Sequence, residues 1–371
     1  MQKKTIHFYS DSWEWGGQEI LSARLASALA ESNEYKVSFF YSCAKFKEAL
    51  CPQIQAIQLP YSSSTPFPIF RDRSYSKKRI CKQLFLENNV SFLVVCPGNI
   101  ERCLPAIYVA NELSLKIVSY LPMAYSQVES GSVLGHLRDF MALPIYPLIN
   151  QWIVISDTQE KLLRRYISPQ IPVYQIPNPL TWETLSAPKA PQTPLQIGTV
   201  GRINFGQKRQ NIIPPLASAF LKENIPVKFN IIGNGTDVSK LEHLIRKYQV
   251  SSSILCEPWL SSNEIQERMN KNWNVLFIPS RFESGPMVLF EAFQCGIPVL
   301  IANAAYVSDY SLPGWMVYDG SVGDAFQKLK ELPDKWDETV FLKTRENLLK
   351  DRYDAAFRRI LTDVFKKVIQ I

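Results

Sequence analysis

The sequence contains few cysteines, and those present form no pattern. Its seven cysteines are scattered over 371 residues, with no Cys-x-x-Cys pair and no histidine nearby at the spacing of a metal site. Several of them, such as Cys96 and Cys256, lie inside apolar runs. This usage is typical of reduced, buried thiols in a cytoplasmic protein, and it argues against a zinc site.

Long apolar runs are also missing. No stretch reaches the roughly 18 uninterrupted apolar residues that a membrane-spanning helix needs, and the apolar run at the N-terminus is too short for a signal peptide. The apolar fraction is ordinary and the net charge is +7, so we expect a globular protein without a nucleic-acid partner. The charge suits an anionic substrate or an anionic membrane surface, and equally simple solubility.

Strands alternate with helices along both halves of the chain. The first expected domain, residues 1–180, opens with a strand over Thr5–Ser10, a loop that ends in Gly16-Gly17, and a helix over Gln18–Ser32. This order is typical of a nucleotide-binding α/β domain, although the loop lacks the Gly-x-Gly-x-x-Gly spelling of a dinucleotide site.

A polar segment rich in proline separates the two halves. Because it shows no helical or strand period, a linker is predicted over residues 181–194, followed by a second α/β domain over 195–345. The tail from Lys343 to Val368 is predicted to be helical, and residues 346–371 are expected to cross back to the first domain. The fold class is therefore α/β, with two Rossmann-like, doubly wound parallel sheets that face a central cleft.

A loop with two basic residues begins the second domain. Arg202 and Lys208 bracket a short polar turn between a strand and a helix, where two cations suit a diphosphate. Gly233-Asn-Gly235 forms a second turn from strand to helix, which allows a ligand to approach the backbone closely. The alternatives are a solvated basic turn and a glycine turn that merely reverses the chain.

Two glutamates follow the apolar run from Trp273 to Ile278, which is predicted to be a strand. Glu283 lies on a polar turn after that strand, and Glu291 lies eight positions later in an apolar helix. Carboxylates would repel a phosphate, but they accept hydrogen bonds from the hydroxyl groups of a sugar. The alternative is that Glu283 caps the helix and Glu291 belongs to a solvated face.

Taken in order, these motifs resemble those of the retaining GT-B glycosyltransferases called family 4, or glycosyl transferases group 1. The resemblance covers nearly the whole chain and includes Val154-Ile155-Ser156, Ile176-Pro177-Asn178 and Pro279 to Glu283. It implies retaining transfer of a sugar from a nucleotide-diphosphate sugar to a saccharide or lipid-linked saccharide acceptor. It also implies a role in polysaccharide or glycoconjugate biosynthesis, with neither a metal nor another cofactor.

The resemblance also assigns roles to residues. It implies that Arg202 and Lys208 hold the diphosphate and that Glu283 binds the donor sugar, which makes these three the catalytic set. Glu291 would bind the ribose, the turn at Pro258 and Trp259 would face the base, and Gly16 and Gly17 would lie near the phosphate and the acceptor. The full donor-binding set is Gly16, Gly17, Gly233, Pro258, Trp259, Ser284, Gly285, Pro286, Met287, Val288 and Glu291.

Two absences qualify the mechanism. There is no Asp-x-Asp pair in a loop that would require a metal, and the histidine that family members often carry after the strand over Lys116–Leu121 is missing. His136, in the next helical stretch, is a candidate for the cleft. A front-face reaction needs no protein base. A non-catalytic scaffold that binds a nucleotide sugar, and a sugar-nucleotide epimerase of the same fold, stay as alternatives.

A contact with an anionic membrane is also expected. The apolar tip from Phe67 to Phe70 is followed by a run of basic residues that could meet lipid head groups and a lipid-linked acceptor: Arg71, Arg73, Lys77, Lys78 and Arg79. The protein would then act in the cytoplasm at the inner face of the membrane. The alternative is a solvated helix end beside a packed loop.

Overall fold

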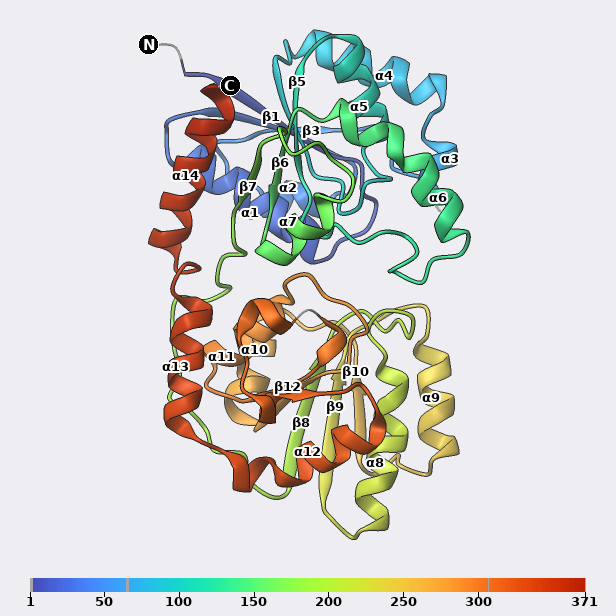
Figure 1. Cartoon of the computed structure of the whole chain (residues 1–371), viewed down its shortest axis with the longest axis vertical. Helices are drawn as coiled ribbons and strands as arrows, with labels where there is room; N and C mark the ends of the chain where they lie inside the picture. The colour runs from blue at the N-terminus through green and yellow to red at the C-terminus, as the bar shows by residue number, and fades with distance from the viewer. Residues whose placement is uncertain (1–2, 65–66, 306, 371) are drawn as a thin grey trace. The chain divides into compact units, whose positions relative to one another are not determined.

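The chain folds into two compact units. The computed structural model describes residues 3–64, 67–305 and 307–370. Unit 1 comprises Met1–Pro179 together with Asp354–Ile371, and unit 2 comprises Leu180–Tyr353. Each unit is built around its own parallel sheet with helices on both faces (Figure 1). The two doubly wound α/β sheets predicted from the alternation of elements are therefore confirmed.

The sheet of unit 1 has seven parallel strands in the order β3-β2-β1-β4-β5-β6-β7. Its winding reverses between β1 and β4, which are adjacent in space. At such a switch point the loops after two neighbouring strands diverge and leave room for a ligand. The strands are β1 (Thr5–Ser10), β2 (Lys36–Tyr41), β3 (Gln55–Gln58), β4 (Phe92–Val95), β5 (Lys116–Tyr120), β6 (Gln151–Val154) and β7 (Val173–Gln175).

Apolar side chains hold the helices of unit 1 to its sheet. The Phe8 ring of β1 stacks on Phe39 of β2 at 5.7 Å, and it lies 6.3 Å from Phe365 near the C-terminus. The last helix therefore completes this core. The helices are α1 (Gly17–Glu31), α2 (Lys45–Ala49), α3 (Pro68–Arg71), α4 (Tyr75–Glu87), α5 (Leu104–Glu112), α6 (Gly135–Ala142), η1 (Leu143–Leu148), α7 (Asp157–Leu163) and α14 (Asp354–Gln370).

The sheet of unit 2 has six parallel strands in the order β10-β9-β8-β11-β12-β13, and its winding reverses between β8 and β11. Position 198 in β8 is a glycine because a Cβ there would lie 2.1 Å from the indole of Trp273. The strands are β8 (Leu195–Val200), β9 (Val227–Ile232), β10 (Ile254–Glu257), β11 (Val275–Ile278), β12 (Val299–Ala302) and β13 (Val317–Tyr318).

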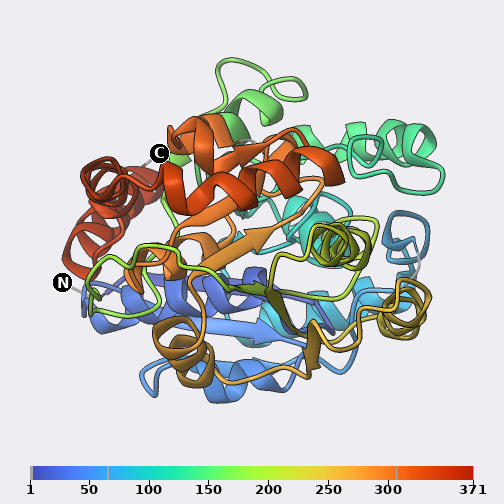
Figure 2. The ribbon, with the colours of Figure 1, turned by 90° about the horizontal axis from the view of Figure 1, so that it is seen from below.

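The helices of unit 2 cover both faces of its sheet with separate apolar clusters. On one face α12 packs against α8, as Figure 2 shows. On the other face α11 packs against α13. The helical elements are η2 (Gln210–Ile212), α8 (Ile213–Lys222), α9 (Val238–Lys247), α10 (Ser262–Lys271), α11 (Met287–Gln294), η3 (Asn303–Ala305), η4 (Val307–Tyr310), η5 (Gly314–Met316), α12 (Val322–Lys335) and α13 (Glu338–Leu349).

The continuous helical tail predicted from Lys343 to Val368 is wrong. The structure has two helices, α13 and α14, separated by residues 350–353. The break has a tertiary cause, because the guanidinium of Arg352 lies 3.9 Å from the centre of the Phe290 ring and its carbonyl accepts a hydrogen bond from the backbone of Leu180. These contacts fix a turn where the local sequence contains neither glycine nor proline.

The segment predicted as a linker is held in place by unit 2. Residues 181–194 lie in unit 2, where the backbone N–H groups of Ser186 and Lys189 donate to the carbonyls of Gln294 and Gly296. The predicted apolar tip from Phe67 to Phe70 overlaps the short helix α3, and residues 65–66 before it lie outside the described residues. In the part of the chain that the structure describes, no helix is both long enough and apolar enough to span a bilayer.

Candidate active site

The loops after β8 and β11 meet where the winding of the second sheet reverses. The backbone N–H of Arg281, after β11, donates to the carbonyl of Gln207, after β8, over 2.7 Å. Within the first loop, the N–H of Lys208 donates to the carbonyl of Asn204 over 2.8 Å. Both loops leave the carboxyl ends of neighbouring parallel strands, which is where ligands bind in sheets of this kind.

Lys208 and Glu283 form an ion pair across these two loops. The Lys208 Nζ lies 2.5 Å from Glu283 Oε1, and the Ser280 hydroxyl donates to the same oxygen over 2.6 Å. The Glu283 side chain is 8% exposed and that of Lys208 is 23% exposed. The structure thus brings together two of the three predicted catalytic residues, and it fixes the carboxylate with a hydroxyl that was not among the predicted site residues.

Arg202 occupies the beginning of the same loop. The residue is exposed, and its carbonyl accepts a hydrogen bond from the Gln210 amide over 2.9 Å. That bond holds the backbone of the loop. Arg202 and Lys208 therefore both belong to the loop after β8, as their order in the sequence predicts.

The segment from Ser284 to Val288 leads into helix α11. Pro286 precedes the helix in an extended conformation, and no side chain caps the helix N-terminus. The Ser284 carbonyl accepts a hydrogen bond from the hydroxyl of Tyr310 over 3.1 Å, and Gly285 is half-buried. The first-turn N–H groups of a helix have no carbonyl partner within the helix, so Met287 and Val288 contribute to a positive end that suits an anion.

Glu291 lies in the second turn of α11 and meets a different segment of the chain. Its Oε1 accepts a hydrogen bond from the hydroxyl of Thr181 over 2.7 Å. The residue is half-buried. Thr181 lies 110 positions away in the sequence, in the segment predicted as a linker, so no local pattern indicates this contact.

The glycine turn after β9 packs directly on the loop after β8. A Cβ on Gly233 would lie 2.0 Å from the carbonyl oxygen of Gly201, and one on Gly235 would lie 2.2 Å from that of Ile203. The Ile203 N–H donates to the carbonyl of Asn234 over 2.9 Å. These glycines therefore have a packing role beyond the predicted approach of a ligand, since they let two loops of the site touch.

Pro258 and Trp259 form an exposed turn after β10. The N–H of Gly233 donates to the carbonyl of Glu257 over 3.0 Å, so this turn lies beside the glycine turn. Trp259 is 50% exposed. A half-exposed aromatic ring next to the site provides a face on which a planar base can stack.

Gly16 and Gly17 lie in unit 1, at the junction between β1 and α1. Gly16 precedes the helix in an extended conformation, and a Cβ on Gly17 would have no atom within 4 Å. The protein itself therefore does not require glycine at position 17. This open space belongs to the carboxyl end of β1, next to the switch point of the first sheet.

A buried polar cluster lies beside that junction and was not predicted. Asp11 is fully buried, its Oδ1 accepts a hydrogen bond from the N–H of Cys103 over 3.1 Å, and its Oδ2 has no partner among the described residues. Burial, reinforced by the nearby Asp72 carboxylate, raises the pKa of Asp11 to about 6. The Arg102 guanidinium donates to Ser12 over 3.1 Å and lies 3.6 Å from Glu14.

This cluster joins the loops after β1 and β4. The available signal was the polar residues that follow both strands, but only the sheet order shows that these strands are neighbours. His136, the candidate from the sequence, lies exposed on α6. Among residues 3–64, 67–305 and 307–370, no group of three or more potential ligand side chains is placed to hold a metal ion.

Similar sequences are found among glycosyltransferases. Residues 181–339 match the model of a family described as Glycosyl transferases group 1. The lipopolysaccharide 1,6-galactosyltransferase of Salmonella typhimurium strain LT2 is 29% identical over 153 residues, which are 40% of this chain and 42% of that protein. The chain thus spans about two fifths of the length of the curated relatives it matches.

Solved structures resemble the whole chain. The lipopolysaccharide outer core galactosyltransferase WaaB, in its apo form, aligns with a TM-score of 0.71 at 21% identity, covering 98% of this chain and 99% of that one. Anabaena Alr3699/HepE in complex with UDP-glucose aligns with a TM-score of 0.75 at 12% identity, with the same coverage. At these identities the likeness shows the fold.

Proposed function

We propose that this chain, whose residues 181–339 match the glycosyl transferases group 1 family, transfers a sugar from a nucleotide-diphosphate sugar to a saccharide acceptor. The relation to glycosyl transferases group 1 and the GT-B fold, both predicted from the motifs, are confirmed, whereas membership of family 4 and retention stay predictions. The acceptor would belong to a lipopolysaccharide or another polysaccharide under assembly, in keeping with the name of the Salmonella relative.

The observation that carries the proposal is the Lys208–Glu283 pair at the switch point of the second sheet, directly before helix α11. A fixed cation and the uncapped helix N-terminus favour a diphosphate. A carboxylate held by a lysine and a serine cannot bind that phosphate, but it can accept hydrogen bonds from the hydroxyls of a sugar. A nucleotide-diphosphate sugar carries both kinds of group at neighbouring positions.

In the proposed reaction, the bond between the anomeric carbon and the diphosphate oxygen breaks. Lys208, Arg202 and the first-turn amides of α11 stabilise the negative charge that develops on the leaving diphosphate. The acceptor oxygen bonds to the anomeric carbon on the same face, with retention, and passes its proton to the departing phosphate. Glu291 with Thr181 would hold the ribose, and Trp259 would stack on the base.

Thermal shift measurements with UDP-, GDP- and ADP-sugars test the donor site. We expect one nucleotide sugar to raise the melting temperature of the wild-type protein, as the UDP-glucose complex of the structural neighbour suggests. Lys208→Ala should abolish that shift. Lys240→Ala should preserve it, because Lys240 lies on α9 and forms an ion pair with Asp237. Equal stabilisation of wild type and Lys208→Ala would contradict the assignment.

Contact with an anionic membrane is the second part of the proposal. The predicted apolar tip is largely packed, since Ile69 is fully buried. The exposed apolar surface lies instead on and around α6, where Val133 is 72% exposed and Phe140 is 71% exposed. Leu137 and Leu143 are also exposed on this stretch. An apolar helix face turned to solvent is typical of a helix that lies in a membrane interface.

Basic residues lie beside this apolar face. The Arg73 guanidinium donates to the carbonyl of Met141 over 3.1 Å, which ties the segment before α4 to α6, and Arg71 is exposed. Apolar and cationic groups side by side match the interior and the head groups of an anionic bilayer. The protein would then work at the cytoplasmic face of a membrane, where a lipid-linked acceptor is available.

Vesicle flotation tests this surface. The double variant Leu137→Ser, Phe140→Ser should bind phosphatidylglycerol-containing vesicles at least about tenfold more weakly, because it removes the two apolar anchors. Leu86→Ser is the matched control, since Leu86 is 59% exposed on α4. No binding by the wild type at low salt, or a wild-type dimer that the double variant dissociates, would contradict the membrane assignment.

A further inference from the structure

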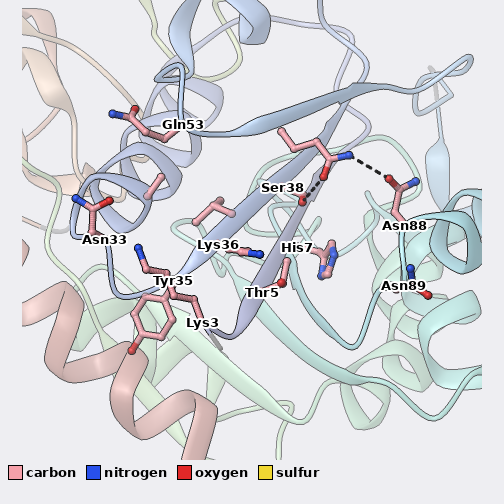
Figure 3. A pocket seen from close by; sticks show the side chains of 13 residues that line it. Lys3, Thr5, His7, Asn33, Tyr35, Lys36, Ser38, Gln53, Asn88 and Asn89 are labelled. Atoms are coloured by element: carbon pink, nitrogen blue, oxygen red, sulfur yellow. Dashed lines mark hydrogen bonds between the residues drawn. The ribbon is translucent and has the colours of Figure 1, made fainter. Parts of the chain in front are cut away.

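A pocket of about 680 Å³ opens at the amino ends of β1, β2 and β3 in unit 1. It lies at the edge of the sheet opposite to the one that carries Gly16 and Gly17. Figure 3 shows Thr5, His7 and Lys36 grouped at its middle. No role at this edge follows from the proposed transfer reaction.

His7 forms part of the wall and has an unused polar atom. The residue is 2% exposed and its ring stacks on Phe40, yet its Nδ1 has no hydrogen-bond partner among the described residues. Burial lowers the pKa of His7, although the backbone of Phe92 and Asn88 opposes that shift, so the neutral ring is favoured. A buried nitrogen without a partner is unfavourable, and a ligand hydroxyl could satisfy it because a hydroxyl both donates and accepts.

Side-chain amides near His7 are joined by two long hydrogen bonds. The Ser38 hydroxyl donates to Gln55 Oε1 over 3.3 Å, and Gln55 Nε2 donates to Asn88 Oδ1 over 3.4 Å, as the dashed lines in Figure 3 show. Each amide keeps further donor or acceptor capacity after these bonds. Amide groups that both donate and accept suit the ring hydroxyls of a sugar.

The charge of the lining is entirely positive. Lys3 and Lys36 contribute two ammonium groups, and no aspartate or glutamate lines the pocket. Neither lysine forms an ion pair with another residue in the part of the chain that the structure describes. The helices α1 and α4, which end nearby, have no basic residue in their last turns. The lysines offset those helix ends in part, and because no acidic side chain lines the pocket they also attract an anion.

We propose that this pocket binds a saccharide that carries one anionic group, a phosphate or a carboxylate. Lys3 and Lys36 would hold the anionic group, while His7, Gln55 and Asn88 would bind ring hydroxyls. The site is contained in unit 1 and does not depend on the donor site of unit 2. In a protein that assembles polysaccharides, it would bind a charged sugar away from the transfer reaction.

NMR of the histidine rings tests the proposal. The chain has only three histidines, so the ring signals of His7 can be assigned by comparison with His7→Gln. We expect glucose 6-phosphate or glucuronate, added to about 10 mM, to shift the His7 signals with millimolar affinity. Glucose, which lacks the anionic group, should bind at least about tenfold more weakly, in line with the loss of a charge-assisted contact.

Variants distinguish this pocket from the donor site and from the general effect of an added anion. Lys36→Gln should weaken the His7 response about tenfold, whereas Lys4→Gln, which removes an exposed neighbouring lysine outside the lining, should not change it. Lys208→Ala should keep the response, because Lys208 lies in unit 2. Unchanged His7 signals with both anionic sugars would overturn the proposal, and so would a response that Lys36→Gln preserves. Neither result would affect the donor site.

Discussion

The carboxyl group of Asp11 is buried in the interior of unit 1. Its pKa in the folded state is about 6, above the ordinary value of 3.8, mainly because burial disfavours the charged form. The folded protein therefore binds the Asp11 proton more tightly than the unfolded chain does. The resulting stability is fully present below pH 3.8 and is lost as the pH rises through 6. At neutral pH the ionised group costs about 3 kcal/mol.

Asp11→Asn should therefore stabilise the protein at neutral pH. The amide resembles the protonated acid, and its oxygen can still accept the bond from the N–H of Cys103. We expect the free energy of unfolding to rise by up to about 3 kcal/mol at pH 7.5, and the gain to vanish near pH 4. Chemical denaturation at a series of pH values measures this. Parallel pH profiles for the two proteins would show that Asp11 does not titrate as described.

Lys208 and Glu283 are coupled in stability as well as in the proposed reaction. Lys208→Ala removes the cation from a carboxylate that is 8% exposed, although the Ser280 hydroxyl still donates to it over 2.6 Å, so we expect a loss of about 1–3 kcal/mol. Lys208→Ala combined with Glu283→Ala should recover part of that loss, because the buried charge is gone. Activity should fall at least about a hundredfold in both single variants, Lys208→Ala and Glu283→Ala, and in the double variant.

Denaturation and a transfer assay on the same four proteins distinguish the two effects. Recovery of stability without recovery of activity is the expected pattern, since both groups are proposed to contact the donor. Additive stability losses would mean that the ion pair contributes nothing, and near-normal turnover in either single variant would exclude that residue from the reaction.

Individual residues are predictable from the sequence where their chemistry is local. Arg202, Lys208 and Glu283 follow strands, and that pattern is visible in the chain. Their partners are not predictable, because Thr181 meets Glu291 across 110 positions and Lys208 meets Glu283 across 75. From the sequence, Asp11 is predicted only as part of a turn, since the residues next to it in the sequence do not show that the loop after β4 covers it.

At the scale of elements, the glycine turn after β9 determines how two loops of the site fit together. Gly233→Ala would place a Cβ 2.0 Å from the Gly201 carbonyl at a φ of +147°, which ordinary residues rarely adopt. We expect a loss of about 2–4 kcal/mol in unfolding free energy and weaker donor binding. Thermal denaturation with and without the donor measures both.

Gly17→Ala is the matched control for that variant. Position 17 also lies where a strand leads into a helix, but a Cβ there would have no atom within 4 Å. Its stability should change by less than about 0.5 kcal/mol. Similar losses in both variants would show that the steric contact with Gly201 is not the cause.

Most elements are predictable because their patterns are strong. Buried strands such as β4 and β11 are short, continuous apolar runs. The helical stretch from Val133 to Leu148 forms α6 and η1, and Pro147 lies inside η1. The interruption after α13 is not predictable from local sequence because its cause is Arg352 over Phe290, a tertiary contact. The exposure of the apolar side of α6 is also not predictable from local sequence, since periodicity alone does not show which side of a helix packs against the core.

At the scale of the whole molecule, unit 1 is made of two separate pieces of chain. Its last piece, α14, buries Phe357, Leu361, Phe365 and Val368 almost completely. Each such side chain contributes about 1.5–3 kcal/mol, and their sum is comparable to the whole stability of a domain, about 5–15 kcal/mol. Deletion of residues 354–371 should therefore unfold unit 1.

Hydrogen exchange read by mass spectrometry tests this deletion. Peptides from residues 1–179 should lose their protection, while those from 180–353 should keep it, because unit 2 retains its own sheet and both of its apolar clusters. Phe365→Ala is a milder variant that should cost about 3–5 kcal/mol. Retained protection of unit 1 in the deletion would show that α14 is only peripheral to its core.

The position of α14 at the end of the chain also determines the order in which the two units can fold during synthesis. Translation delivers residues 180–353 as one uninterrupted piece, so unit 2 can fold as soon as it leaves the ribosome. Unit 1 begins first but must wait for α14, with the apolar side of its sheet uncovered near Phe8. A stalled or prematurely terminated chain would thus carry a finished second unit joined to an unfinished first one, which chaperones and proteases can recognise by its exposed apolar surface.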